Sequence, residues 1–152
     1  MVRQACYAFP FGTVIIGYDE SAVTHIRIQE PDSLPNIPSS ISDWAAMQLQ
    51  EYFEGIRCHF TFPVRIDGTD FQKSVWRELS RIPYGHVRSY SQIASAIGKP
   101  NASRAVGMAC SRNPLWFVIP CHRVIGKNGA LTGYAGGAAM KQYLLDLEKN
   151  HS

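Results

Sequence analysis

The sequence predicts an α/β (α+β) protein in two parts, a small sheet-and-helix domain over residues 1–67 and a mostly helical domain over residues 68–152. Three observations predict this fold class. A run rich in β-branched residues near the N-terminus has the composition of strands. Several later segments repeat apolar residues at helical spacing. The chain has 152 residues and is 45% hydrophobic, which supplies packed cores for one domain or two small ones.

The N-terminal part is predicted to be a hairpin followed by a helix. The runs 12–18 (GTVIIGY) and 23–28 (VTHIRI) flank turn-like residues, which predicts two antiparallel strands. Residues 31–40 hold three prolines and three serines, the composition of a loop. From Ile41, apolar residues recur with a helical period until Gly55 ends the helix. The members of that stripe are Trp44, Ala45, Leu49, Tyr52 and Phe53.

The second part begins with a helix that carries an apolar stripe from Phe71 to Leu79, with Asp70 as the expected N-cap. Ser89 is expected to cap a short helix that ends before Gly98. Asn101 is expected to cap the next helix, which stops at Asn113-Pro114. Two short helices joined by a tight, glycine-containing link predict a helix-turn-helix.

The last third is predicted to hold one buried strand and one helix. The apolar run Leu115–Ile119 is closed by Pro120 and has the pattern of a buried strand. A final helix is expected from Ala138 to Glu148. Its inward side chains would be Tyr143, Leu144 and Leu147.

Charge is distributed unevenly along the chain. Residues 1–72 carry four basic and nine acidic side chains, whereas residues 73–127 carry nine basic side chains and only Glu78 as an acid. This asymmetry indicates either a surface that binds a polyanion or a solvated basic face without a partner, and charge alone leaves both open. No apolar run approaches the ~20 residues that span a bilayer, and no secretory signal is visible. The four cysteines lack close paired spacing, which favours a reducing, intracellular compartment.

Cys121 is the candidate nucleophile. A thiol needs a base or nearby positive charge to become reactive, and His122 and Arg123 follow it directly. Neighbouring side chains in an extended segment point apart, so His122 is expected to act through a turn or a water. The alternative for an isolated Cys-His pair is a structural cysteine beside a packing histidine. Cys58-His59 and Cys121-His122 also lack the spacing of a zinc site, so no metal is expected.

Residues 71–148 resemble the O6-alkylguanine-DNA alkyltransferase family in the order and spacing of their motifs. Residues 89–94 (SYSQIA) and 104–107 (RAVG) match the helix-turn-helix of that family. Over the N-terminal half the resemblance covers only the order of elements, and it implies an RNase-H-like domain. The other matching motifs are Asn113-Pro114, Pro120-Cys121-His122-Arg123-Val124, Gly133-Tyr134, Gly136-Gly137 and Leu147-Glu148.

The family moves an alkyl group from guanine O6, and often from thymine O4, onto its own cysteine. The resemblance therefore implies that Cys121 is the nucleophile and His122 the base. Glu148 would hold the histidine in the right tautomer, and Asn113 would help to order a water near the turn. The implied proton relay runs from Cys121 through a water to His122, with Glu148 behind it.

The resemblance also implies how DNA and the flipped base are held. Arg104 would enter the duplex in place of the extruded base, and Tyr90 would push on the backbone phosphate. Small residues on the recognition helix would allow close approach to the minor groove. Further DNA-binding residues are Ala105, Gly107 and Arg123, and the substrate-binding residues are Tyr134, Val124, Ala135 and Trp116. For Trp116, a pocket wall and a core position both stay open.

As a whole, the resemblance implies an enzyme that needs no cofactor and no metal. Its partner would be double-stranded DNA containing O6-alkylguanine, and we expect a monomer without a membrane partner. The expected location is the cytoplasm, or the nucleus in a eukaryote. One alternative is a non-catalytic DNA-binding module that senses alkyl lesions, although such relatives commonly replace the nucleophile. A cysteine hydrolase is the other alternative, and it would turn over.

Overall fold

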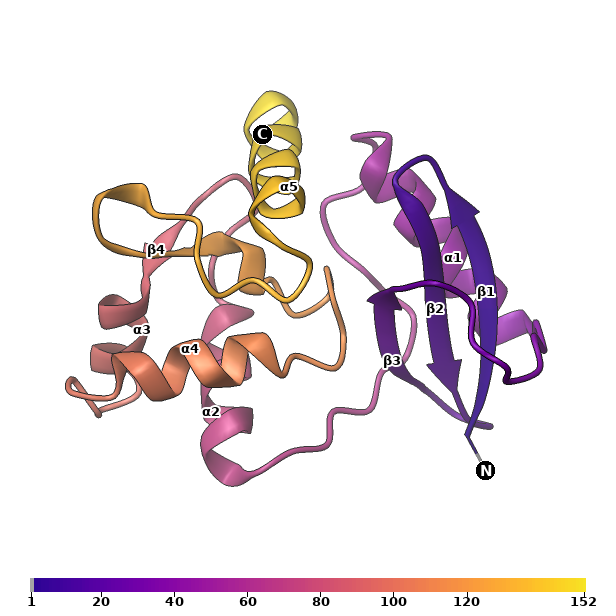
Figure 1. The fold of residues 1–152 in the computed structure, drawn as a ribbon, viewed down its shortest axis with the longest axis horizontal. Coiled ribbons are helices and arrows are strands. Elements are labelled where there is room, and N and C mark those ends of the chain that lie inside the picture. The colour runs from indigo at the N-terminus through magenta and orange to yellow at the C-terminus, as the bar shows by residue number, and fades with distance from the viewer. Residues whose placement is uncertain (1) are drawn as a thin grey trace. The chain divides into compact units, whose positions relative to one another are not determined.

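The computed structural model describes residues 2–152 and divides the chain into two compact units. One unit contains the chain up to Asp67 together with Pro114–Trp116, and the other contains Gly68–Asn113 and Phe117–Ser152. Helices and short strands both occur, so the predicted mixed α/β class is confirmed (Figure 1). In the described residues, no helix combines the length and the apolar character that crossing a membrane requires.

The N-terminal unit contains an antiparallel sheet with the strand order β1-β2-β3. The predicted hairpin is confirmed as β2 (Gly12–Tyr18) and β3 (Val23–Ile28). Strand β1 (Arg3–Phe9) was not predicted, because its sequence RQACYAF neither alternates clearly nor is rich in β-branched residues. It pairs with β2 along its whole length, so this strand depends on its neighbour more than on its own pattern.

Helix α1 (Ser40–Phe53) confirms the predicted helix of the N-terminal unit. Ser39 caps it in a reciprocal capping box with Ser42. Leu49 and Tyr52 are fully buried, whereas Trp44 is 40% exposed and lies outside the core. Glu54 ends the helix, and the glycine that follows has a φ of 77°, the left-handed geometry common after a helix.

The C-terminal unit contains the predicted helix-turn-helix, α3 (Tyr90–Ala96) and α4 (Ser103–Ser111), preceded by α2 (Asp70–Leu79). Ser89 caps α3 as expected, by accepting from the Gln92 N–H. The other two caps lie one residue away from the expected ones. Thr69, not Asp70, caps α2 because its hydroxyl accepts from the third helical N–H, and α4 begins after Ala102 without a side-chain cap.

Helix α5 (Ala138–His151) is longer than predicted and ends close to the C-terminus. Leu144 and Leu147 are buried as expected. The inward position predicted for Tyr143 is wrong, because this side chain is 44% exposed. One residue corresponds to about 100° of rotation in a helix, which moves Tyr143 off the buried stripe that contains Leu144.

The strand predicted over Leu115–Ile119 is wrong. Only Leu115 forms an isolated bridge, to Ile26, and the residues after it form turns. Phe117 has a φ of 74°, in the left-handed region that no strand contains. Leu115, Phe117 and Ile119 are all buried, so the apolar run belongs to a buried turn and not to a strand. This turn brings the chain back toward Asn113.

Candidate active site and nucleic-acid groove

The candidate nucleophile lies in a short 3-10 helix, η1 (Cys121–Arg123), which replaces the extended segment expected here. The Arg123 N–H donates to the Pro120 carbonyl at 2.9 Å and closes the turn. Cys121 is 2% exposed and His122 is fully buried. With three residues per turn, successive side chains point about 120° apart. The imidazole therefore leaves the turn in a different direction from the thiol, as the sequence already indicated.

Asn113 lies beside the thiol because the buried turn returns the chain to it. Its Nδ2 donates to the Ile119 carbonyl at 2.8 Å and to the Cys121 Sγ at 3.0 Å. The side chain is 5% exposed, so both bonds are shielded from water. A donor aimed at sulfur favours the thiolate over the thiol. Asn113 thus holds the turn and supports the charged form of Cys121.

Glu148 of α5 accepts hydrogen bonds from three different residues. Its Oε2 contacts the His122 Nε2 at 2.7 Å. Arg123 reaches both oxygens, with Nε at 2.7 Å and Nη2 at 3.0 Å, and the Gly85 N–H donates to Oε1 at 3.1 Å. The remaining Arg123 nitrogen donates to the Ile82 carbonyl at 2.7 Å. The carboxylate therefore joins α5, the 3-10 turn and the segment after α2.

The orientation of Arg123 differs from the sequence-based expectation of a DNA contact. Its side chain is 10% exposed and its donors are directed at Glu148 and the Ile82 carbonyl. A guanidinium forms a bidentate pair with a carboxylate more strongly than a single contact with a solvated phosphate. Arg123 is thus directed into the site, where it orients Glu148.

Burial and hydrogen bonding set the protonation states of the site. Burial raises the pKa of the Cys121 thiol to about 11, opposed by the Asn113 hydrogen bond and the Lys141 charge. Burial also lowers the pKa of His122, although its bond to Glu148 opposes this shift. For Glu148, burial raises the pKa but the hydrogen bonds from His122 and Arg123 outweigh it, so the pKa lies below its usual value. At neutral pH the site therefore holds a thiol, a neutral imidazole and a carboxylate.

Lys141 is a site residue that sequence reasoning missed. Its side chain is fully buried, and Nζ donates to the Thr132 carbonyl at 3.1 Å and to the Tyr90 hydroxyl at 3.4 Å. Burial lowers the pKa of the ammonium, which the Cys121 and Cys110 thiolates would oppose. Its spacing to Leu144 and Glu148 follows the helical period of the buried face, and this was the available signal.

A groove of about 680 Å³ runs between the helix-turn-helix and the loop after Val124. The Tyr90 hydroxyl forms part of its wall and donates to the Thr132 carbonyl at 2.5 Å. Gly133 approaches this hydroxyl so closely that a Cβ would lie 2.7 Å from it, and its φ is 77°. Both observations favour glycine at this position. Other groove residues are Arg104, Gly107, Met108 and Lys127.

The structure places the remaining predicted site residues in different surroundings. Tyr134 is 8% exposed, and its ring centroid lies 6.5 Å from that of His122. Val124 is fully buried and begins strand β5 (Val124–Ile125), which pairs in parallel with β4 (Arg88–Ser89). Ala135 and the recognition-helix residue Ala105 are both exposed.

Trp116 clusters with the N-terminal unit, not with the unit that contains Cys121. Its backbone N–H donates to the Ile26 carbonyl at 3.1 Å, and the residue is half-buried. The predicted strand that would have carried it into the core is absent. A position at the alkyl side of the pocket stays a prediction from the resemblance.

A helix-turn-helix and a buried cluster of thiol, imidazole and carboxylate in one unit define a DNA-binding protein with a reactive cysteine. Residues 70–150 match the family described as 6-O-methylguanine DNA methyltransferase, DNA binding domain. The chain is 45% identical over 151 residues to the methylated-DNA–protein-cysteine methyltransferase of Methanosarcina barkeri, covering 93% of this chain and 94% of the relative. The chain belongs to the methylated-DNA–protein-cysteine methyltransferase family.

Further relatives cover the two units together. The constitutive methylated-DNA–protein-cysteine methyltransferase of Bacillus subtilis is 44% identical, with 92% of this chain and 91% of the relative covered. The crystal structure of Mycobacterium tuberculosis OGT in complex with DNA is 42% identical with a TM-score of 0.90, and the match covers 99% of this chain and 94% of that one. The resemblance recognised in the sequence is thereby confirmed.

Proposed function

We propose that the protein repairs DNA by irreversible transfer of an alkyl group, chiefly methyl, from O6-alkylguanine in a duplex to its own Cys121. The observation that carries this proposal is the buried cluster in which Asn113 contacts the thiol at 3.0 Å and Glu148 contacts the imidazole at 2.7 Å. The groove beside the recognition helix supplies the second requirement, a surface for DNA. By the same chemistry, O4-alkylthymine is a further substrate.

In the proposed reaction the thiol proton moves to His122, directly or through a water. Because Glu148 engages Nε2, the proton is accepted at Nδ1, and the carboxylate stabilises the imidazolium that forms. The thiolate of Cys121 attacks the alkyl carbon while the carbon–O6 bond breaks, and its electron pair leaves with guanine. The departing guanine takes up one proton, which balances the thiol proton that the His122 imidazolium then releases, and Tyr134 assists the release of guanine by hydrogen bonding. The product is a thioether, which has no leaving group for hydrolysis, so each molecule reacts once.

Guanine O6 lies inside the base stack, so the nucleotide must be extruded before it can react. We assign Arg104 to the space that the base leaves and Tyr90 to the backbone beside it, since both line the groove. Ala105 and Gly107 have little or no side chain, which allows the helix to lie close to the DNA. Arg123 is assigned to positioning Glu148 instead of DNA binding, on the contacts described above.

We further propose that the protein acts as a monomer without a cofactor, in a reducing compartment such as the cytoplasm. Cys6, Cys58, Cys110 and Cys121 are all free thiols, and a nucleophilic thiol must stay reduced to act. The non-catalytic lesion sensor is less well supported, since that function does not require a thiol placed against Asn113.

Intact-protein mass measurement tests the proposal. Incubation with an O6-methylguanine duplex is expected to add one methyl mass to Cys121 and then stop. Cys121→Ser is expected to abolish the mass shift but to keep DNA binding, because a hydroxyl is a far weaker nucleophile and the groove is unchanged. Continued turnover would indicate a hydrolase, and binding without any mass shift in the parent protein would indicate a sensor.

A further inference from the structure

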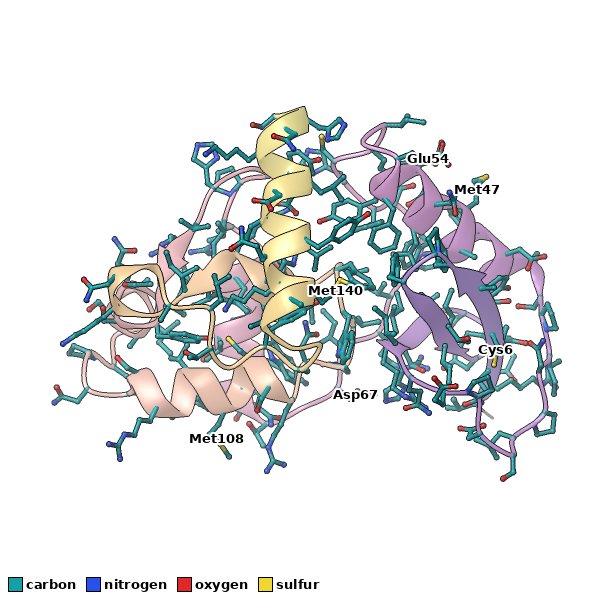
Figure 2. All side chains as sticks on the ribbon, turned by 45° about the horizontal axis from the view of Figure 1, so that its top comes forward. Cys6, Met47, Glu54, Asp67, Met108 and Met140 are labelled. Atoms are coloured by element: carbon teal, nitrogen blue, oxygen red, sulfur yellow. The ribbon has the colours of Figure 1, made fainter. Side chains whose placement is uncertain are left out.

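The outer face of helix α4 carries one large apolar side chain. Met108 is 56% exposed and lines the groove together with Arg104 and Gly107. Figure 2 shows its side chain projecting away from the helix. The other exposed residues of α4, Arg104, Ala105 and Ser111, are cationic or small. A single exposed methionine requires no partner by itself, as the equally exposed Met47 of α1 shows, so the charges around Met108 decide what it contacts.

Met108 lies between two cations on this face. Arg104 precedes it by one helical turn and Arg112, the C-cap, follows it by one turn, and both are exposed. At a rise of about 1.5 Å per residue, the two arginines lie about 12 Å apart along the helix axis. Arg104, Met108 and Arg112 therefore form a stripe with positive charge at both ends and apolar surface between them.

No carboxylate side chain is among the residues that line the groove containing Arg104 and Met108. The sequence contains no aspartate or glutamate between Glu78 and Asp146, and the groove is lined by hydroxyl, cationic and small residues. A nucleic-acid groove has the complementary pattern, because two negatively charged backbones flank less polar sugar and base edges. Charge complementarity therefore identifies duplex DNA as the occupant of this face.

We propose that Met108 contacts the duplex beside Arg104 and packs its thioether against sugar and base edges where the target base leaves the stack. This inference rests on the proposed function and names a residue that adds affinity without charge. An unbranched, polarizable side chain adapts to an irregular surface, and methionine is among the apolar wedges of minor-groove binding proteins. Met108 is thus a DNA-contact residue that stabilises the extruded state.

The test measures duplex binding over a salt series, in a Cys121→Ser background so that no transfer occurs. Met108→Ala is expected to weaken binding to an O6-methylguanine duplex about tenfold, or about 1.4 kcal/mol. The slope of log K against log salt is expected to stay unchanged, because no phosphate contact is lost. Arg112→Ala, in contrast, is expected to reduce that slope by about 1. Met108→Leu keeps an apolar side chain of similar volume and is expected to bind nearly normally.

Met47 provides the matched control, since it is 54% exposed on α1 of the N-terminal unit (Figure 2). Met47→Ala is expected to bind duplex normally. Unchanged binding in Met108→Ala, equal losses in the two methionine variants, or a reduced salt slope would each overturn the inference. With Cys121 restored, Met108→Ala is expected to react normally with free O6-benzylguanine and more slowly with duplex. Failure of the parent protein to acquire an alkyl group would instead refute the proposed function, which the binding series does not test.

Discussion

The Glu148→Gln variant tests whether one buried carboxylate both stabilises the turn and supports the reaction. Glu148 is 1% exposed and accepts two bonds from Arg123 and one from His122. Glutamine has nearly the same shape but no charge, and its NH₂ group would face donors. The substitution therefore leaves the Arg123 guanidinium buried without its counter-ion.

Removing one partner of a buried ion pair costs about 3–5 kcal/mol, because the other charge stays desolvated. The two Arg123–Glu148 contacts, at 2.7 Å and 3.0 Å, form a bidentate pair for which this range applies. For a chain of this size each kcal/mol lowers Tm by about 2–4 °C, so the expected decrease is about 6–20 °C. Arg123→Met is expected to lose a similar amount, because it leaves the buried carboxylate without its cationic partner and with only the contacts from His122 and the Gly85 N–H.

The double variant Glu148→Gln/Arg123→Met removes both charges together. Its loss of unfolding free energy, measured by denaturant unfolding, is expected to be smaller than the sum of the losses in the single variants by about 1–3 kcal/mol.

The rate of alkyl transfer distinguishes the role of Glu148 in stability from its role in the reaction. Glu148→Gln is expected to slow single-turnover transfer about 10²-fold or more, since the imidazolium loses its stabilising charge. Arg123→Met keeps the His122–Glu148 contact and is expected to lose less than tenfold. Additive stability losses, or equal rate losses in the two single variants, would refute this reasoning.

Three more predictions follow from the site. Arg104→Ala is expected to slow repair of duplex more than reaction with free O6-alkylguanine, because only the duplex needs the space of the base filled; equal losses in single-turnover assays would contradict this. Asn113→Ala is expected to slow transfer about tenfold and to raise the pH at which the Cys121 thiol reacts with an alkylating reagent, because the donor at 3.0 Å from Sγ is lost; an unshifted pH profile would exclude the contact as the cause. In a His25→Gln background, which removes another histidine of lowered pKa, the free energy of unfolding is expected to fall as the pH drops below about 6.5. The reason is that burial lowers the pKa of His122, so the unfolded chain binds a proton that the folded chain does not, and stability is present above that pH and lost below it. A free energy of unfolding that stays constant between pH 7 and 5 in urea titrations would contradict the assignment of this pH dependence to His122.

The helix positions, and the proposed nucleophile and base, could be predicted from the sequence alone. Local spacing suffices for them, because a helix satisfies its backbone within the segment, and Ser89 or Gly55 marks an end by its own chemistry. The motif around Cys121 and His122 was likewise contiguous, so it was visible without the fold. Glu148 was identified only through the resemblance, since nothing local distinguishes a carboxylate near a helix end.

Tertiary structure decided what depends on distant partners. Strand β1 exists because it pairs with β2 over its full length, and the apolar run Leu115–Ile119 became a turn because the backbone reverses at Phe117. The burial of the Arg123 and Lys141 side chains could not be predicted from the sequence either, since both residue types are usually solvated. Each is buried because an acceptor outside its own helix or turn faces it, Glu148 for Arg123 and the Thr132 carbonyl for Lys141. A sequence pattern records which side chains are apolar, but the folded chain alone determines which buried charge finds its counterpart.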